Sequence, residues 1–175
     1  RVVAEQTYDR GGAPIPFDNH VGFRQIFNGT NLDGWDGDPK KLEGRTVGIP
    51  EWAQTAGVYV RGLLGEFYGV DISAINWVQA GVNQPGRTEK VKLELPAGIR
   101  YASRGETSLN EMLLSGGIDA AITARPPAGF HDTGSGIRRL FPDPRAEERR
   151  YYQATGVFPI MHVVAMRRDV YEANR

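Results

Sequence analysis

Cysteine is absent from this chain of 175 residues, and so is any excess of charge of one sign. Without cysteine there is no disulfide framework, thiol nucleophile or thiolate metal site. Lysine plus arginine and aspartate plus glutamate both number 21, which argues against a general nucleic-acid binder, because such proteins are normally basic. No apolar run approaches the ~20 residues that span a bilayer. We therefore expect neither a nucleic-acid partner nor insertion into a membrane.

The sequence also lacks an initial methionine and the pattern of a signal peptide. It begins Arg1-Val2-Val3 and stops within a helical pattern at Asn174-Arg175, which indicates a fragment or a processed piece. We expect a cytoplasmic protein, with a periplasmic location as the alternative if a signal sequence precedes this piece.

The composition changes near Lys40. Residues 1–44 are rich in Gly, Pro, Asn and Asp, so we expect an irregular N-terminal segment without a core of its own. Residues 45–175 alternate strand-like and helix-like patterns, which is typical of a parallel or mixed sheet with crossover helices. The predicted fold class is therefore α/β, with a central sheet flanked by helices.

Apolar spacing and end signals place the individual elements. The predicted strands cover residues 45–49, 75–79, 99–102, 118–122 and 162–166, and the predicted helices cover residues 55–69, 108–117, 143–156 and 168–174. Ser108 and Glu111 match the S-x-x-E capping box at the start of the second helix. Asp143 and Pro144 are typical of the cap and first position of the third helix. Thr55 is the predicted N-cap of the first helix.

The candidate site residues lie where strands meet loops. Glu51, Gln54 and Thr55 lie between the first strand and the first helix. Arg125 directly follows a strand, and His162 begins one. Ligands of open α/β sheets bind at the edge where strands give way to helices. We therefore expect these five residues to line one concave surface.

Each candidate has a structural interpretation beside the functional one. His162 is either a buried structural histidine or a proton donor or acceptor, a role that imidazole suits. Arg125 is either a surface arginine or a bidentate clamp for a carboxylate. Thr55 either caps its helix only or also attracts a carboxylate to the free N–H groups and helix dipole. Gln54 and Arg61 are assigned to substrate binding in the same region, although Arg61 could equally be a solvated side chain.

The segment Pro85-Gly86-Arg87-Thr88-Glu89-Lys90 is either a turn or a loop that closes over a ligand. No HExxH, Walker or dinucleotide-binding glycine motif occurs, so we expect neither a metal nor an organic cofactor. His20 and His131 lie in predicted loops without a spacing that suggests metal binding. A metal held by His162 with Glu51 has no support in the sequence.

Several ordered motifs resemble those of a known family. The motifs are Lys41 through Trp52, Arg61-Gly62, Tyr68-Gly69-Val70, residues 85–90, Gly117-Ile118-Asp119-Ala120, Thr123-Ala124-Arg125 and Thr155 through His162. They resemble the second lobe of 4,5-dihydroxyphthalate decarboxylase-like proteins, which are relatives of periplasmic solute-binding proteins. The resemblance implies one lobe of a type II periplasmic-binding-protein-like fold. It also implies that the first lobe of the same fold is a missing partner.

Residues 17–39 resemble a different family. The stretch Gly22 to Pro39 looks like the first strand and turn of a jelly-roll domain of 3-keto-disaccharide hydrolase type. A chimeric gene or a spliced fragment would explain this. Because one strand cannot build a sandwich core, the preferred interpretation is a Gly-rich tail on the α/β body.

Two functions follow from these observations. The resemblance implies an aromatic-acid decarboxylase that acts on 4,5-dihydroxyphthalate or a similar hydroxylated aromatic carboxylate. Arg125 and the helix start at Thr55 would anchor carboxylates, and His162 or Glu51 would be the general acid. The alternative is the solute-binding component of an ABC transporter, which uses the same anchors for a small carboxylate without chemistry. The expected ligand is thus a small aromatic carboxylate, and the sequence leaves a homo-oligomer open.

Overall fold

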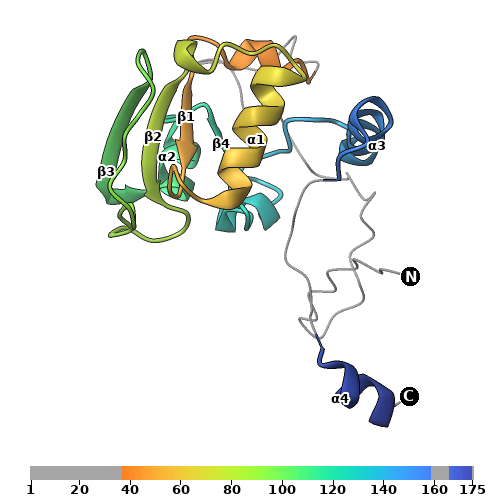
Figure 1. Cartoon of the computed structure of the whole chain (residues 1–175). Coiled ribbons are helices and arrows are strands. Elements are labelled where there is room, and N and C mark those ends of the chain that lie inside the picture. The colour runs from red at the N-terminus through yellow and green to blue at the C-terminus, as the bar shows by residue number, and fades with distance from the viewer. Residues whose placement is uncertain (1–36, 159–165, 175) are drawn as a thin grey trace.

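The computed structural model describes residues 37–158 and 166–174 (Figure 1). Its elements are η1 (Pro39–Leu42), β1 (Thr46–Ile49), α1 (Thr55–Glu66), η2 (Ile72–Ala74), β2 (Asn76–Gly81), β3 (Arg100–Ser108), α2 (Leu109–Ser115), β4 (Ala120–Ala121), η3 (Ala128–His131), α3 (Pro144–Thr155) and α4 (Arg168–Ala173). Most of the predicted segment 1–44 lies outside the described residues. So does the strand predicted at 162–166, apart from its last residue.

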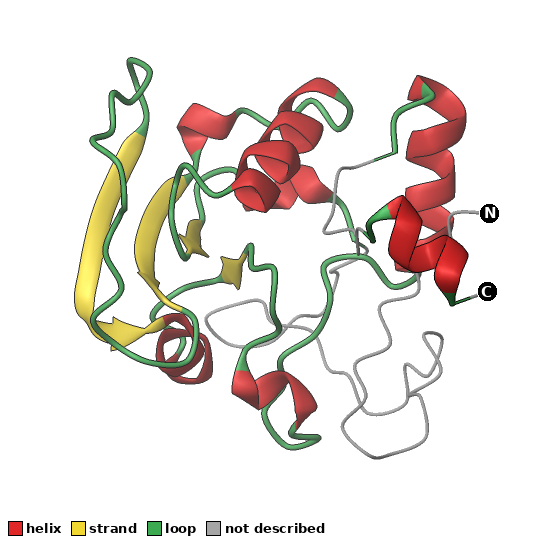
Figure 2. Ribbon diagram, turned by 60° about the horizontal axis from the view of Figure 1, so that its bottom comes forward, coloured by secondary structure: helices red, strands yellow, loops and turns green. Residues whose placement is uncertain are grey.

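The four described strands form one parallel sheet in the order β3-β2-β1-β4, with helices on both sides (Figure 2). Thr46 of β1 pairs with Asn76 of β2, and Val47 pairs with Ala120 of β4. Parallel neighbours need crossover connections. Helix α1 provides one between β1 and β2, and α2 provides one between β3 and β4. This arrangement confirms the predicted α/β class.

The central strands β1 and β2 contribute buried apolar side chains to both faces of the sheet, because successive residues of a strand point in opposite directions. On one face, Val47 and Ile49 of β1 pack with Leu64 of α1. On the other face, Val78 of β2 packs with Leu109 of α2. Two apolar layers thus hold the strands, and the loops at the ends of the strands carry the polar residues.

Local end signals are confirmed at two helices. Ser108 Oγ accepts a hydrogen bond from the Glu111 N–H at 3.2 Å, and the Glu111 carboxylate accepts one from the Ser108 N–H at 2.9 Å, which completes the capping box. The Asp143 carboxylate accepts from the Ala146 N–H at 3.0 Å, and Pro144 is the first helical residue. These caps join residues three positions apart, so the sequence alone contains both partners.

The strand lengths differ from the prediction. Strand β3 spans Arg100–Ser108 where residues 99–102 were expected, and β4 spans only Ala120–Ala121 where 118–122 were expected. Most β3 side chains are exposed at the edge of the sheet, so the strand lacks the apolar alternation that identifies a half-buried strand. Strand β4 pairs with β1 through two residues before the chain turns away.

The described end of the N-terminal segment contributes to the core. Pro39 and Leu42 of η1 are buried, and Leu42 belongs to the apolar cluster that contains Val47 and Ile75. The division of the chain at residue 44 stays a prediction.

Two glycine-to-alanine substitutions are expected to change stability in opposite directions. At Gly48 in β1, a Cβ would lie 2.5 Å from Leu109 Cδ2 and 2.8 Å from Ile118 Cδ1. Overpacking of this kind should lower the free energy of unfolding by about 1–3 kcal/mol. Gly62 in α1 is exposed, and a new Cβ there would have no atom within 4 Å. Gly62→Ala should therefore raise the free energy of unfolding by about 0.5–1 kcal/mol. Urea unfolding of both variants measures the difference, and a stable Gly48→Ala variant would contradict the packing described above.

Candidate functional site

Two predicted site segments lie at the carboxyl edge of the sheet. Strands β1 and β4 are parallel neighbours with Gly48 opposite Ala121. Glu51 follows β1, and Arg125 follows β4 at the same edge. The Arg125 side chain is exposed, and its backbone carbonyl accepts a hydrogen bond from Thr123 Oγ1 at 2.6 Å. His162, the third member of the predicted surface, lies outside the described residues.

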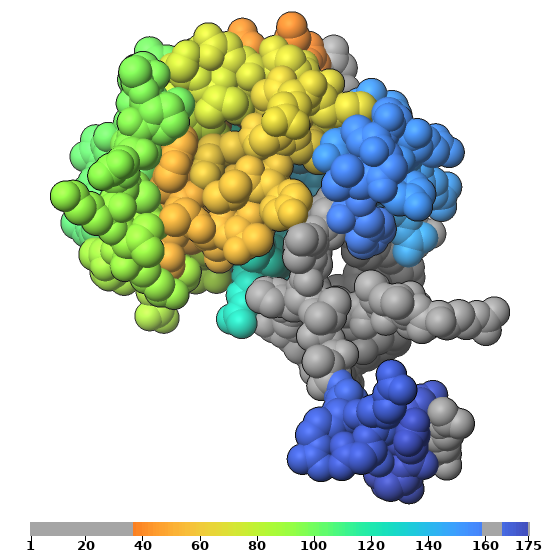
Figure 3. All heavy atoms as spheres, in the orientation of Figure 1, coloured from red at the N-terminus to blue at the C-terminus, as the bar shows by residue number. Residues whose placement is uncertain are grey.

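The loop after β1 is held by the connection between β2 and β3. Glu51 is buried, and its Oε1 accepts from Arg87 Nε at 2.8 Å and from Arg87 Nη2 at 2.5 Å. Lys90 Nζ lies 3.6 Å from the same oxygen. In the space-filling view, the green β2–β3 connection lies directly against the orange residues that follow β1 (Figure 3). The segment 85–90 therefore packs over the predicted site loop.

Glu89 of that segment contacts the backbone of the β1 loop. Its Oε2 accepts from the Trp52 N–H at 2.6 Å, and its Oε1 accepts from the Ala53 N–H at 3.3 Å. The Tyr101 hydroxyl lies 3.5 Å from Glu89 Oε2. Burial, and to a smaller extent the charge of Glu89, raises the pKa of Tyr101 to about 12. The phenol is thus a hydrogen-bond donor to this carboxylate at neutral pH.

Gln79 and Ser103 complete the support of this loop. Gln79 is buried in β2, and its Nε2 donates to the carbonyls of Pro50 at 2.9 Å and Arg87 at 2.8 Å. Its Oε1 accepts from Ser103 Oγ at 2.7 Å. The sequence reasoning missed both residues. A glutamine beside apolar residues in a predicted strand was the available signal, because a buried amide needs hydrogen-bond partners.

Arg61 is the buried cation of the site. Its side chain extends from α1 and is only 7% exposed. The guanidinium carbon lies 3.9 Å from the centroid of the Trp52 ring, and Nη2 donates to the Trp52 carbonyl at 2.6 Å. Nη1 is buried without a hydrogen-bond partner among the described residues. Burial lowers the pKa of Arg61 to about 10, against the opposing charge of Glu89. The solvated alternative for this side chain is therefore wrong.

Gly57 allows Arg61 to lie against the first turn of α1. A Cβ at this position would be 3.2 Å from Arg61 Nη1 and 3.7 Å from the Glu51 carbonyl oxygen. The orphan nitrogen thus lies beside the helix start and the loop that precedes it. An unpaired buried donor is uncommon in a folded protein and calls for an explanation.

The predicted cap of α1 is wrong by one residue. Gln54 is the N-cap and makes no side-chain capping bond, whereas Thr55 is the first helical residue and is exposed. The first intrahelical bond runs from the Val58 N–H to the Gln54 carbonyl at 3.0 Å. The N–H groups of residues 55–57, which lie between Gln54 and Val58, have no acceptor among the described residues. The Gln54 amide and the Thr55 hydroxyl therefore do not cap the helix, and both stay available to a ligand.

The geometry combines features that bind anions. Free N–H groups at a helix start carry a partial positive charge. Beside them lie the Arg61 guanidinium and the two loop N–H groups that already hold Glu89. Arg125 follows the neighbouring strand of the same edge. The chain is thus an α/β protein with polar residues at the carboxyl ends of its parallel strands. This is the edge at which such sheets usually bind ligands.

Two curated proteins are similar to this chain. It is 37% identical over 137 residues to a 4,5-dihydroxyphthalate decarboxylase of Comamonas testosteroni, and the match covers 78% of this chain and 42% of that protein. It is 38% identical over 114 residues to a 4,5-dihydroxyphthalate decarboxylase of Pseudomonas putida, with 65% of this chain and 44% of that protein covered. These matches confirm the resemblance to the 4,5-dihydroxyphthalate decarboxylase-like family.

The chain spans less than half the length of the curated relatives that it matches. No family model matches it. Both relatives are named as decarboxylases, and neither name describes a transport protein. Within the part of the chain that the structure describes, no helix is long and apolar enough to cross a membrane.

Proposed function

We propose that this chain forms part of a decarboxylase that acts on 4,5-dihydroxyphthalate or a similar hydroxylated aromatic carboxylate. The match to two decarboxylases over most of the chain carries this proposal. The anion-binding groups at the carboxyl edge support it, because such a substrate carries carboxylates. The missing first lobe of the same fold would supply the opposite wall of the site.

The reaction needs an anchor, an electron source and a proton donor. Arg125 and the helix start at Thr55 hold carboxylates of the substrate, with Gln54 and Arg61 beside them. A ring hydroxyl pushes electrons toward the carbon that bears the departing carboxylate. That carbon takes up a proton, and its bond to the carboxylate then breaks. Carbon dioxide leaves, and the electron pair of the broken bond returns to the ring, which restores the aromatic ring and its hydroxyl.

A general acid delivers that proton and forms the new C–H bond. His162 is our first assignment, and Glu51 is the second. The Oε1 atom of Glu51 already accepts two hydrogen bonds from Arg87.

Carbon dioxide release from 4,5-dihydroxyphthalate tests the proposal. We expect little or no turnover by the 175-residue chain and clear turnover by a two-lobe version that carries the same second half. With one wall missing, water enters, the anchors weaken in high dielectric and the ring is not held against its proton donor. Comparable turnover by both versions would contradict the two-wall arrangement. No turnover by the two-lobe version would contradict the proposed function.

Variants of the two-lobe version assign the roles. His162→Ala should abolish turnover and spare binding. Arg125→Ala should raise KM by about tenfold or more, because a charge-assisted hydrogen bond to a carboxylate is lost. Arg104→Ala is the matched control, since Arg104 is an exposed arginine of the edge strand β3. Equal effects of Arg125→Ala and Arg104→Ala would remove Arg125 from the substrate-binding set.

A further inference from the structure

We propose that the loop after β1 contains a carboxylate-binding subsite that Glu89 of the same chain fills in this structure, and that a ligand carboxylate replaces Glu89 there. The inference rests on the proposed function for the chemical class of the ligand. It adds a residue that competes with that ligand, and it gives segment 85–90 a role in ligand entry.

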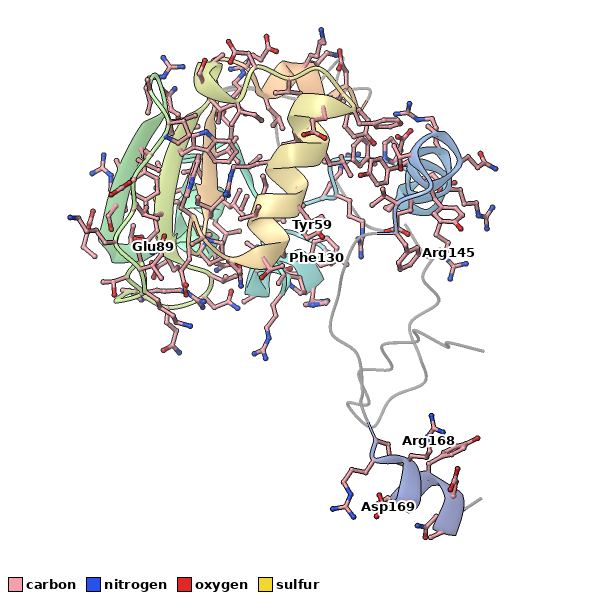
Figure 4. All side chains as sticks on the ribbon, viewed as in Figure 1. Tyr59, Glu89, Phe130, Arg145, Arg168 and Asp169 are labelled. Atoms are coloured by element: carbon pink, nitrogen blue, oxygen red, sulfur yellow. The ribbon has the colours of Figure 1, made fainter. Side chains whose placement is uncertain are left out.

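The contacts of Glu89 are those that a bound carboxylate would make. Its two oxygens accept from two successive backbone N–H groups, those of Trp52 at 2.6 Å and Ala53 at 3.3 Å. The Tyr101 hydroxyl lies 3.5 Å from one of these oxygens. Glu89, labelled in Figure 4, comes from the β2–β3 connection and lies 36 and 37 residues away from Ala53 and Trp52 in the sequence. A separate molecule with a carboxylate could present the same two oxygens.

Arg61 points independently to a ligand at this place. More than nine tenths of its side chain is buried, yet Nη1 has no hydrogen-bond partner among the described residues. Nη2 of the same guanidinium donates to the Trp52 carbonyl, so the head group lies beside the loop that holds Glu89. Burying a guanidinium costs free energy unless its donors are satisfied. A bound carboxylate near the start of α1 would satisfy the remaining donor.

The exchange does not require the whole segment to leave. Arg87 is attached to Glu51 through its side chain and to Gln79 through its backbone carbonyl. Glu89 lies two residues further along and is only half buried. Glu89 can therefore swing away from Trp52 and Ala53 while Arg87 keeps the base of the segment in place.

Phthalate is a suitable probe, because it has two adjacent carboxylates on a ring. Its binding can be measured without an assay of carbon dioxide release. Binding to the 175-residue chain is measured by calorimetry, and the Trp52 and Ala53 amides are followed by two-dimensional NMR. The variants are Glu89→Gln, Arg61→Met and the control Glu94→Gln. Glu94 is an exposed carboxylate of the same β2–β3 connection, so its substitution makes the same change in net charge.

We expect Glu89→Gln to bind phthalate about tenfold more tightly than the unchanged chain, because neutral hydrogen bonds compete less well than charge-assisted ones. Glu94→Gln should bind like the unchanged chain, and Arg61→Met should lose binding. Phthalate should shift the amide signals of Trp52 and Ala53. Equal or weaker binding by Glu89→Gln would overturn the inference. So would phthalate binding without a shift of the Trp52 and Ala53 amide signals, or the absence of binding by both the unchanged chain and Glu89→Gln.

Failure of the proposed function would look different. In that case the two-lobe version would release no carbon dioxide, while Glu89→Gln would still bind phthalate more tightly than the unchanged chain. Should Arg61→Met fail to fold, the comparison of Glu89→Gln with Glu94→Gln still decides the question, because neither Glu89 nor Glu94 is buried in the core.

Discussion

Replacement of Trp77 by alanine is expected to lower the free energy of unfolding by about 3–5 kcal/mol. Trp77 is 1% exposed at the centre of the larger apolar cluster. Its ring meets the Trp52 ring edge-on at 5.6 Å, and its indole N–H donates to the Ile72 carbonyl at 3.0 Å. The variant loses the buried area, leaves a cavity and removes the donor of that carbonyl.

Urea unfolding followed by circular dichroism measures the change. Val91→Ala is the control, because Val91 is 53% exposed and its truncation should change stability by less than about 0.5 kcal/mol. Trp77→Ala should also disturb the site, since Trp52 and Arg61 both lie against this ring. A Trp77→Ala chain that unfolds at the same urea concentration as the unchanged chain would show that this core does not form as described.

Replacement of Arg87 by alanine should cost about 3 kcal/mol, because it leaves the buried Glu51 carboxylate without its close partner. The side chain of Glu51 is 8% exposed, and the remaining cation, Lys90, is 75% exposed at 3.6 Å. Arg104→Ala is the matched control. Its ion pair with Glu106 spans 3.8 Å between side chains that are 60% and 69% exposed, so it should contribute less than about 1 kcal/mol.

A double-mutant cycle identifies the cause of the loss. Glu51→Gln in the Arg87→Ala background removes the unpaired charge, so it should restore much of the lost stability. Additive effects of the two substitutions would mean that the ion pair contributes nothing by itself. The single variant Glu51→Gln also tests Glu51 as a general acid. Its effect on stability in this cycle can be compared with its effect on the turnover of the two-lobe version.

Elements whose determinants are close in sequence could be predicted. The capping box of Ser108 with Glu111 and the start of α3 at Asp143-Pro144 both depend on residues at most three positions apart. Strand β1 was also predicted within one residue. Helix α1 was found, but its cap was not, since the chain used Gln54 without a side-chain bond.

Only part of the candidate site could be predicted from the sequence. Motif resemblance pointed to residues 50–55 and to Arg125, and the strand order places both at one edge. The partners that hold the loop were not identified, because Arg87 and Glu89 lie 36 and 37 residues from Glu51 and Trp52. No periodicity or local spacing relates residues so far apart. Their meeting depends on the β2–β3 connection folding back over β1.

The sequence by itself determined the α/β class, the helix ends with local caps and the family resemblance, because each rests on short-range patterns or on ordered motifs. Only the tertiary structure decided that Arg61 is buried with one free donor and that Glu51 is paired with Arg87. It also decided that Glu89 occupies the N–H groups of Trp52 and Ala53. Burial and charge pairing are properties of the packed chain, since they depend on which distant segments exclude water from the same place.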